Sequence, residues 1–459
     1  MFDVERSENR KGIDMHLPTP CEKVEKLQTA LHTKAKAEPE FRFYALYDKM
    51  YRLDVLSYAY ERCLANRGAA GVDDQTFEDI GKYGVSKWLG ELAEELKART
   101  YKPQAVRRVW IPKADGKQRP LGIPTIRDRV AQMAAVLILE PIFEADLQPE
   151  QHAYRAGKSA HEAVQAVAAH LDRGHTEVVD ADLSGYFDSI PHAELMKSVS
   201  RRIVDRHVLH VIKLWLEAAV EETDERGRKV RTTRNKDEGK GTPQGGVLSP
   251  LLANLYMRRF ILAWKVQGHE ARLGARIVNY ADDFVILARD AAKADEAMAV
   301  MRGIMGKLKL TVNEQKTRRC ALPEETFTFL GYTFGRCYSR KTGRAYLSAR
   351  PSAKKIASMT EKVSELTRGR TTYRETEEVV GSLNSAIRGW ANYFCFGPVT
   401  KIYTALMDHA RWRLRRWLGR KHRVRSGVLY TTYPNECLHE ELGLIQLENF
   451  RPRPLWAKV

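Results

Sequence analysis

The chain has 459 residues, of which 43% are hydrophobic, so it can bury several cores and is not a disordered protein. Its formal net charge of +18 indicates a polyanionic partner, by default nucleic acid, with a membrane surface as the competing polyanion. We find no apolar stretch of transmembrane or signal-peptide type, and therefore expect a soluble, intracellular protein.

The six cysteines are scattered without any CxxC pair, which argues against a disulfide framework and against a structural zinc site. We expect them to be reduced thiols, most of them buried.

Apolar spacing predicts mainly helices over the first third of the chain. The first fifteen or so residues are polar and are expected to be disordered. The pattern then predicts helices over 21–38, 42–65, 85–100 and 126–147, and a hairpin around Asp115-Gly116 within 101–125.

Two later segments look like buried strands but carry carboxylates. One is "HTEVVDADLSGYFDSIPH" at 175–192, and the other is "ARIVNYADDFVILARD" at 275–290, a predicted hairpin with Asp282 and Asp283 near its tip. Burial of an unpaired carboxylate costs several kcal/mol, so these groups must reach solvent at a turn or lie beside a cation. Taken alone, the second segment fits an ordinary solvated turn equally well. Between the two, we expect an exposed hairpin or loop over 221–246 and a helix over 247–264.

The two carboxylate segments together favour a metal site. Adjacent strands that bring Asp182 and Asp282 together would hold the two divalent cations that nucleotidyl transfer needs, and carboxylate oxygens suit Mg²⁺. Without metal, their mutual repulsion would raise a pKa.

The last quarter of the chain is strongly basic. From residue 340 onward there are 23 Lys and Arg against 10 Asp and Glu, which predicts a separate, helical, polyanion-binding region. A helix there would turn Trp412, Leu414, Trp417 and Leu418 inward and present Arg411, Arg413, Arg415 and Arg416 to phosphates. Six to eight such contacts would make log K fall with log salt at a slope of roughly −5 to −7.

Several motifs occur in the order seen in reverse transcriptases. They are "IPKADGKQRPLGIPT" at 111–125, "QHAYRAGKSAHEA" at 151–163, "DADLSGYFD" at 180–188, "GTPQGGVLSPLLANLYM" at 241–257, "YADD" at 280–283, "LTVNEQKTR" at 310–318 and "FTFLGYTFGR" at 327–336. From about residue 40 to 420 the chain resembles the proteins encoded by bacterial group II introns, and "IRGWANYFCFG" at 387–397 is similar to their maturase (thumb) segment.

The resemblance implies an α+β, right-hand polymerase fold with fingers, a palm carrying an antiparallel sheet, and a helical thumb, followed by a basic helical C-terminal region. The segments expected are an N-terminal extension (1–70), reverse transcriptase fingers and palm (71–345), maturase or thumb helices (346–410) and the basic nucleic-acid-binding region (411–459).

The resemblance also implies roles for the acidic residues. Asp182 and Asp282 match the metal-binding carboxylates, with the Leu183 carbonyl completing one metal shell. Asp283 matches the third catalytic aspartate, which is less directly bound.

Substrate contacts are implied in the same way. Lys113 and Arg119 match residues that grip the triphosphate, and Gln244 matches the glutamine that contacts the incoming nucleotide, with Gly245 and Gly246 allowing close backbone approach. Phe187 stands at the steric-gate position that selects deoxynucleotides, although it could also be a core aromatic.

Primer and template contacts complete the set. Tyr280 would lie under the primer terminus. Arg155 and Lys158 suit the template backbone, although solvated loop charges explain them nearly as well.

The implied activity is RNA-directed DNA polymerisation with two Mg²⁺, or Mn²⁺ as a substitute, by a protein that also binds intron RNA to assist splicing and target-primed mobility. Its expected partners are group II intron RNA, a DNA primer or target and deoxynucleoside triphosphates, in the bacterial cytoplasm and at the nucleoid when it acts on DNA. No paired Cys and His ligands follow residue 400, so we expect no endonuclease activity.

Two alternative functions remain: a non-catalytic RNA-binding maturase scaffold, and a related reverse transcriptase with a host role in defence or repair.

Overall fold

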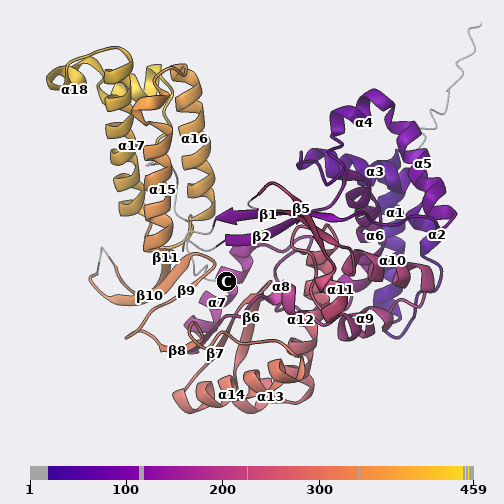
Figure 1. Ribbon diagram of the computed structural model, residues 1–459. Coiled ribbons are helices and arrows are strands. Elements are labelled where there is room, and N and C mark those ends of the chain that lie inside the picture. The colour runs from indigo at the N-terminus through magenta and orange to yellow at the C-terminus, as the bar shows by residue number, and fades with distance from the viewer. Residues whose placement is uncertain are drawn as a thin grey trace, which may run out of the picture. The chain divides into compact units, whose positions relative to one another are not determined.

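The computed structural model describes residues 19–112, 118–224, 226–339, 342–447, 450 and 453. Figure 1 labels its helices and strands. Internal contacts divide the chain into two units. The first unit takes the described residues of Met1–Leu147 and Phe187–Tyr256, and the second those of Gln148–Tyr186 and Met257–Val459. Both units combine helices with sheets, which confirms the α+β class.

Helices of the first unit begin where a side chain can cap them. Thr19 and Thr76 form capping boxes with Glu22 and Asp79, and the Thr125 hydroxyl accepts from the Asp128 amide. The helices are α1 (Pro20–Ala37), α2 (Tyr47–Met50), α3 (Leu53–Ala65), α4 (Phe77–Tyr83), α5 (Val85–Lys97), α6 (Ile126–Glu144), α9 (His192–Ser200), α10 (Arg206–Leu216) and α11 (Arg234–Glu238). Two further helices, α8 (Tyr186–Ser189) and α12 (Ser249–Val266), cross from one unit to the other. The helices predicted over 21–38, 85–100, 126–147 and 247–264 are thereby confirmed.

The single helix predicted over 42–65 is wrong. Residue 43 instead forms a bridge with Ile203, and the Asp205 carboxylate accepts from the amides of Leu46 and Tyr47 at 2.9 and 2.8 Å. These long-range bonds hold the segment before α2 extended, and the chain breaks again between α2 and α3. The apolar residues have helical spacing, but contacts with residues about 160 positions later in the sequence determine the backbone conformation of this segment.

The sheet of the first unit has the strand order β2-β1-β4-β5. Strands β1 (Val106–Pro112) and β2 (Gln118–Ile123) form the predicted antiparallel hairpin, whose tip at Asp115-Gly116 lies outside the described residues. Strands β4 (Val220–Thr223) and β5 (Lys229–Thr232) form the exposed hairpin expected within 221–246.

The second unit contains an antiparallel sheet of order β6-β7-β3-β8. Its strands are β3 (Glu177–Ala181), β6 (Arg276–Tyr280), β7 (Asp283–Ala288) and β8 (Arg318–Ala321), and the helices near it are α7 (Ala160–Asp172), α13 (His269–Leu273) and α14 (Ala291–Lys307). A smaller sheet has the order β11-β10-β9, built from β9 (Phe327–Phe329), β10 (Tyr332–Tyr338) and β11 (Ala345–Pro351). Val178, Val285 and Leu287 join residues of α7 and of the smaller sheet in one buried core.

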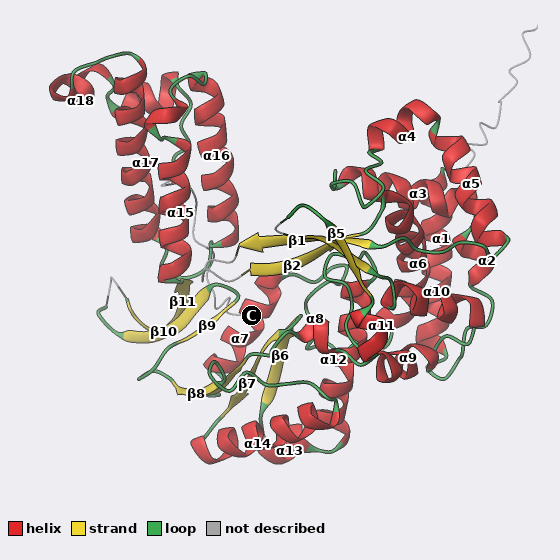
Figure 2. Cartoon of the chain, in the orientation of Figure 1, coloured by secondary structure: helices red, strands yellow, loops and turns green. Residues whose placement is uncertain are grey.

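Three long helices of the second unit pack side by side (Figure 2). They are α15 (Ala353–Leu366), α16 (Thr376–Tyr393) and α17 (Thr400–Lys421), followed by the short α18 (Leu429–Thr432). Short 3-10 segments at Gly369–Thr371 and Ser426–Val428 and a π turn at Cys437–Glu441 complete the described elements. Val363, Leu383 and Leu414 are among the side chains of their common core, and α17 passes residue 411 without a break.

Two expectations from composition can be compared with this fold. Four of the six cysteines are buried and all six are free thiols, as predicted. Among the described residues, no helix has the length and apolarity needed to cross a membrane.

Candidate active site

The turn that carries Asp282 joins two buried strands. Tyr280 pairs with Asp283 across the β6–β7 ladder, so Ala281 and Asp282 form a two-residue turn in which Ala281 has a φ of +59°. The buried Asn279 side chain donates to the Ala281 carbonyl at 2.8 Å and stabilises this turn. The turn therefore lets adjacent carboxylates stand at the end of an otherwise buried hairpin.

Strand register brings Asp182 to the same place. In the β3–β7 ladder Ala181 lies opposite Phe284, so the register directs Asp182, the residue after β3, toward Asp283 at the start of β7. Side chains alternate along β3, which puts Val178, Asp180 and Asp182 on one face. Val178 is in the buried core, whereas Asp182 stands beyond it at the end of the strand.

The electrostatics show that the carboxylates are close together. Loss of hydration, followed by repulsion from Asp282, Asp182 and Asp180, raises the pKa of Asp283 to about 7. Loss of hydration also raises the pKa of Asp180 to about 6, with Arg318 opposing the shift and Asp182 adding to it. Asp283 still keeps exposed surface, so a cation in solution can reach the cluster.

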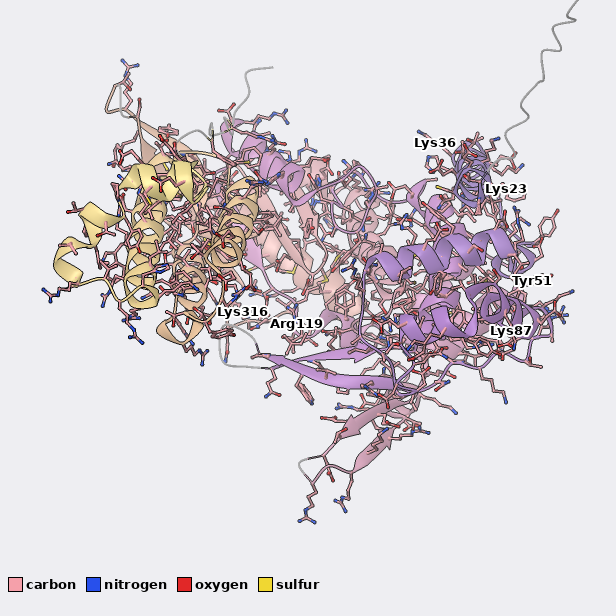
Figure 3. The ribbon with its side chains drawn as sticks, turned by 90° about the horizontal axis from the view of Figure 1, so that it is seen from above. Lys23, Lys36, Tyr51, Lys87, Arg119 and Lys316 are labelled. Carbon is pink, nitrogen blue, oxygen red and sulfur yellow. The ribbon has the colours of Figure 1, made fainter. Side chains whose placement is uncertain are left out.

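Asp182 is held by the segment between α14 and β8. Its Oδ2 accepts from Asn313 Nδ2 at 2.9 Å and from Lys316 Nζ at 3.2 Å, and its amide donates to Thr317 Oγ1 at 3.3 Å. Lys316 is labelled in Figure 3. A β-bridge between Leu183 and Val312 aligns the two segments. These Asn, Lys and Thr side chains belong to the motif "LTVNEQKTR", and no role was predicted for them from the sequence.

The residues present fit divalent cations. Asp180, Asp182, Asp282 and Asp283 create an excess of negative charge, which Lys316 only partly offsets. In the described part of the chain, no three His, Cys, Asp or Glu side chains form a ready metal-binding group. This arrangement suits a hard divalent cation that binds one or two carboxylates and completes its shell with water and substrate phosphate.

The TPQGG loop of the first unit has its own close contacts. The Gln244 carbonyl accepts from the Gly122 amide, and Gln244 Nε2 donates to Asp188 Oδ2 at 3.0 Å. Gly245 has a φ of +107°, and a Cβ there would lie 2.3 Å from the Gly122 carbonyl oxygen. Gly245 therefore allows a close approach of this loop to β2. A close approach of the loop to a nucleotide stays a prediction.

Phe187 lies next to this loop. Its carbonyl accepts from the Thr242 amide at 2.7 Å, and its side chain is half-buried, whereas the neighbouring Tyr186 is buried. A Cβ on Gly246 would lie 2.8 Å from Ser249 Oγ, so the second glycine of the loop is also confined.

Of the two predicted triphosphate cations, only Arg119 can be placed. It is exposed on β2, opposite Ile111 (Figure 3). Lys113 lies outside the described residues.

Comparison with known proteins decides the family. Residues 111–334 match the model of the family "Reverse transcriptase (RNA-dependent DNA polymerase)", and residues 356–433 match "Group II intron, maturase-specific domain". Protein YkfC of Escherichia coli is 32% identical over 368 residues, covering 72% of this chain and 93% of that protein. The chain belongs to the group II intron-encoded reverse transcriptases.

Two further relatives are more distant or more partial. The group II intron-encoded protein LtrA of Lactococcus lactis is 34% identical over 231 residues, so the match covers 49% of this chain and 36% of LtrA. An uncharacterised 91 kDa protein of a cob intron in Schizosaccharomyces pombe is 25% identical over 421 residues, or 76% of this chain and 50% of that protein.

Membership confirms the right-hand polymerase fold, and this reverse transcriptase is an RNA-directed DNA polymerase with a maturase domain. Enzymes of this family generally use divalent metal ions. The antiparallel sheet β6-β7-β3-β8 is thus the palm, and α15–α17 are the maturase helices.

The predicted primer and template residues of this reverse transcriptase lie in the second unit. Tyr280 packs against the palm core, beside the turn at Ala281 and Asp282. Arg155 Nη1 donates to the carbonyls of Gln148 and Gln151 at 2.7 and 2.8 Å, and Lys158 pairs with Glu162 at 3.8 Å. Arg155 thus has a structural role in its loop that we did not expect.

The predicted basic face of α17 is only partly present. Arg415 is buried and donates to the Tyr433 carbonyl at 2.7 Å, whereas Trp412 is 39% exposed, so the orientations expected for these two residues were wrong. Leu414, Trp417 and Leu418 are buried as predicted. Arg415 is buried as well because its guanidinium hydrogen-bonds to Tyr433 and Asn435, which follow α18. The Arg413 guanidinium is bonded to carbonyls at the end of α15, Arg411 pairs with Asp408, and Arg416 is exposed over the Trp412 ring.

Proposed function

We propose that this reverse transcriptase copies group II intron RNA into DNA at the Asp182–Asp282–Asp283 site, using two Mg²⁺ ions. The observation that carries the proposal is the cluster of carboxylates at the open end of β3 and β7, with the pKa of Asp283 raised to about 7. A polymerase scaffold without catalysis would have no reason to keep this destabilising charge.

The palm residues have distinct parts in this proposal. Asp182 and Asp282, with the Leu183 carbonyl, would hold the cations, while Asp283 contributes negative field next to Asp182. Bound Mg²⁺ would activate the primer 3'-hydroxyl and neutralise the triphosphate, so no protein nucleophile is required. Asn313 and Thr317 keep Asp182 in position through their hydrogen bonds.

The nucleotide-binding residues come from the first unit. Lys113 and Arg119 would bind the triphosphate, and Gln244 would contact the incoming nucleotide. The half-buried state of Phe187 supports a steric gate rather than a core aromatic. Phe187→Ala should therefore raise ribonucleotide incorporation relative to deoxynucleotide incorporation.

Intron RNA, a DNA primer and deoxynucleotides are the proposed partners. Tyr280 would support the primer terminus, with Arg155 and Lys158 near the template backbone. The maturase helices within 346–410 and the basic region 411–459 would bind intron RNA, assist its splicing and support target-primed mobility. The protein would then act in the bacterial cytoplasm and at the nucleoid.

The decisive experiment uses Asp282→Ala, with the exposed Asp172→Ala as the matched control. Incorporation of deoxynucleotides on an RNA template with a DNA primer is measured with and without Mg²⁺, alongside RNA binding and intron splicing. We expect Asp282→Ala to lose polymerisation by more than about 100-fold, because metal charge stabilisation contributes several kcal/mol. Polymerisation that survives in Asp282→Ala refutes the metal assignment.

The splicing measurement separates the alternatives. A splicing role that rests on RNA binding alone should survive Asp282→Ala, whereas a host reverse transcriptase should polymerise without any effect on splicing. Binding of the intron RNA by the parent protein and its Asp282→Ala variant should be equal.

A further inference from the structure

The β6–β7 hairpin has a second charged site at the end opposite the aspartate turn. A cavity of about 480 Å³ opens there, and its walls carry five basic side chains and two acidic ones. The basic ones are His170, Arg173, His175, Arg276 and Arg289, and the acidic ones are Glu150 and Glu270. Six residues of extended strand separate Arg276 from Asp282, which is about 20 Å, so this cavity is not part of the catalytic cluster.

The two acidic side chains are already paired. Glu150 lies 2.6 Å from Lys265 Nζ, and Glu270 forms an ion pair with Arg276. Arg173, after the last turn of α7, and Arg289, after β7, are exposed and form no ion pair within the described part of the chain. The cavity therefore has at least two guanidinium groups whose charge is not offset.

The two histidines add hydrogen-bonding groups to this wall. Their rings lie 5.7 Å apart at 73°, and His175 Nδ1 contacts the His170 carbonyl at 3.2 Å. His170 Nδ1 is buried and has no hydrogen-bond partner among the described residues. A buried polar atom without a partner is costly, which favours a ligand or water at this point.

Charged groups on several elements of the cavity wall shift the pKa values of the two histidines. Burial, followed by His175, Arg173 and Arg276, lowers the pKa of His170 to about 4, with only Glu150 opposing. Burial, with Arg289 and Arg276, also lowers the pKa of His175. The charges of this cavity wall thus disfavour a further positive charge and favour an anion.

We propose that this cavity binds a phosphate group. Guanidinium groups match phosphate through paired N–H donors, and neighbouring imidazoles can add further donors. The volume is sufficient for a mononucleotide or for one nucleotide of a chain. The phosphate has two possible sources, the backbone of bound RNA or a small free phosphate compound, and both present the same group to the arginines.

Calorimetric titration of the full-length protein tests the proposal. Inorganic phosphate and AMP are titrated at constant ionic strength in metal-free buffer, where the aspartate cluster repels anions. Arg173→Gln and Arg289→Gln remove the two unpaired guanidinium groups, and Arg272→Gln, on α13 but outside the cavity, is the matched control. Thermal unfolding of each variant establishes that it is folded.

We expect saturable phosphate binding that weakens about tenfold or more in each cavity variant and is unchanged in the control. A short RNA oligonucleotide that competes with phosphate identifies the nucleic-acid backbone as the source. A lack of competition identifies a small phosphate compound instead. Equal titrations of the parent and both cavity variants overturn the proposal.

A second readout depends on the histidines. Sulfate, whose charge is constant between about pH 5 and 8, is titrated at both ends of this range. An anion beside His170 and His175 should raise their pKa values, so sulfate should bind more tightly at the lower pH and binding should take up protons. The same pH dependence in Arg173→Gln and in the parent, without any loss of affinity, contradicts the assignment to this cavity.

Discussion

Lys316 is the counter-ion of Asp182 in the palm, and its Nζ lies 3.2 Å from Asp182 Oδ2. The lysine side chain is 63% exposed, so the pair contributes at most about 1 kcal/mol to stability. Lys316 also lowers the pKa of Asp283, against the shift that the neighbouring carboxylates cause. Its ammonium group therefore supplies part of the positive charge that a divalent cation would bring.

Removal of Lys316 should strengthen the response to divalent cations. Lys316→Met leaves the carboxylates with less positive charge, so the metal-free protein should be less stable by up to about 1 kcal/mol. Addition of Mg²⁺ should raise the melting temperature more in this variant than in the parent. Lys293→Met, which removes a similarly exposed lysine near Glu296, is the control. An equal Mg²⁺ effect in both variants would show that Lys316 does not compete for the site.

Metal-free stability should fall with rising pH. The pKa of Asp283 is about 7 in the folded protein and about 3.9 in an unfolded chain, so the folded state binds the proton more tightly. The free energy of unfolding should therefore decrease between about pH 4 and 7, by less than about 1.4 kcal/mol per pH unit because Asp283 keeps exposed surface. Urea unfolding at several pH values in the presence of a chelator measures this slope.

Asp283→Asn provides the comparison for that slope. In this variant the free energy of unfolding should depend less on pH, and above pH 7 the variant should be more stable than the metal-free parent. Asp180, whose pKa of about 6 is also raised, acts in the same direction and accounts for a remaining slope below that value. A parent slope that Asp283→Asn leaves intact contradicts the electrostatic account of the cluster.

A methyl group on Gly245 should disturb the contact between the TPQGG loop and β2. Its Cβ would lie 2.3 Å from the Gly122 carbonyl oxygen, so the backbone must shift. Gly227→Ala, also at a positive φ but in open space, reports the backbone cost alone, about 1 kcal/mol. We expect Gly245→Ala to lose about 1–3 kcal/mol more than this control, with a higher KM for deoxynucleotides. Equal losses in the two variants would mean that the loop adapts.

Substitution of two neighbouring arginines of α17 should have different effects, with Arg415→Ala lowering stability and Arg416→Ala lowering RNA binding. Arg415→Ala breaks buried hydrogen bonds to the Tyr433 carbonyl and the Asn435 side chain, and should cost about 1–3 kcal/mol of unfolding free energy. Arg416→Ala should leave stability unchanged. If Arg416 contacts an RNA phosphate, this variant should reduce the salt-dependence slope of RNA binding by about 0.7–0.9. Unchanged RNA affinity in Arg416→Ala would remove this arginine from the proposed RNA surface.

Local patterns were sufficient for most elements of the fold. Helical spacing of apolar residues predicted α1, α5, α6 and α12, and alternating residues on both sides of Asp115-Gly116 predicted β1 and β2. The same reasoning failed over 42–65, because Asp205 and the backbone near Ile203 form long-range hydrogen bonds with that segment. The spacing of residues within one segment contains no information about hydrogen-bond partners that lie about 160 residues away in the sequence.

The carboxylate site, too, could be predicted from the sequence only in part. The sequence alone was enough to locate Asp182 and Asp282 at the ends of predicted strands, because period-two alternation and turn residues are local properties. Only the tertiary structure decided that Asp182 lies close enough to Asp283 to raise its pKa, that Asn313 and Lys316 hold Asp182, and that Arg415 is buried while Trp412 is exposed. Strand register and burial depend on which distant surfaces pack together, and the free energy of that packing belongs to the whole fold and to no single segment.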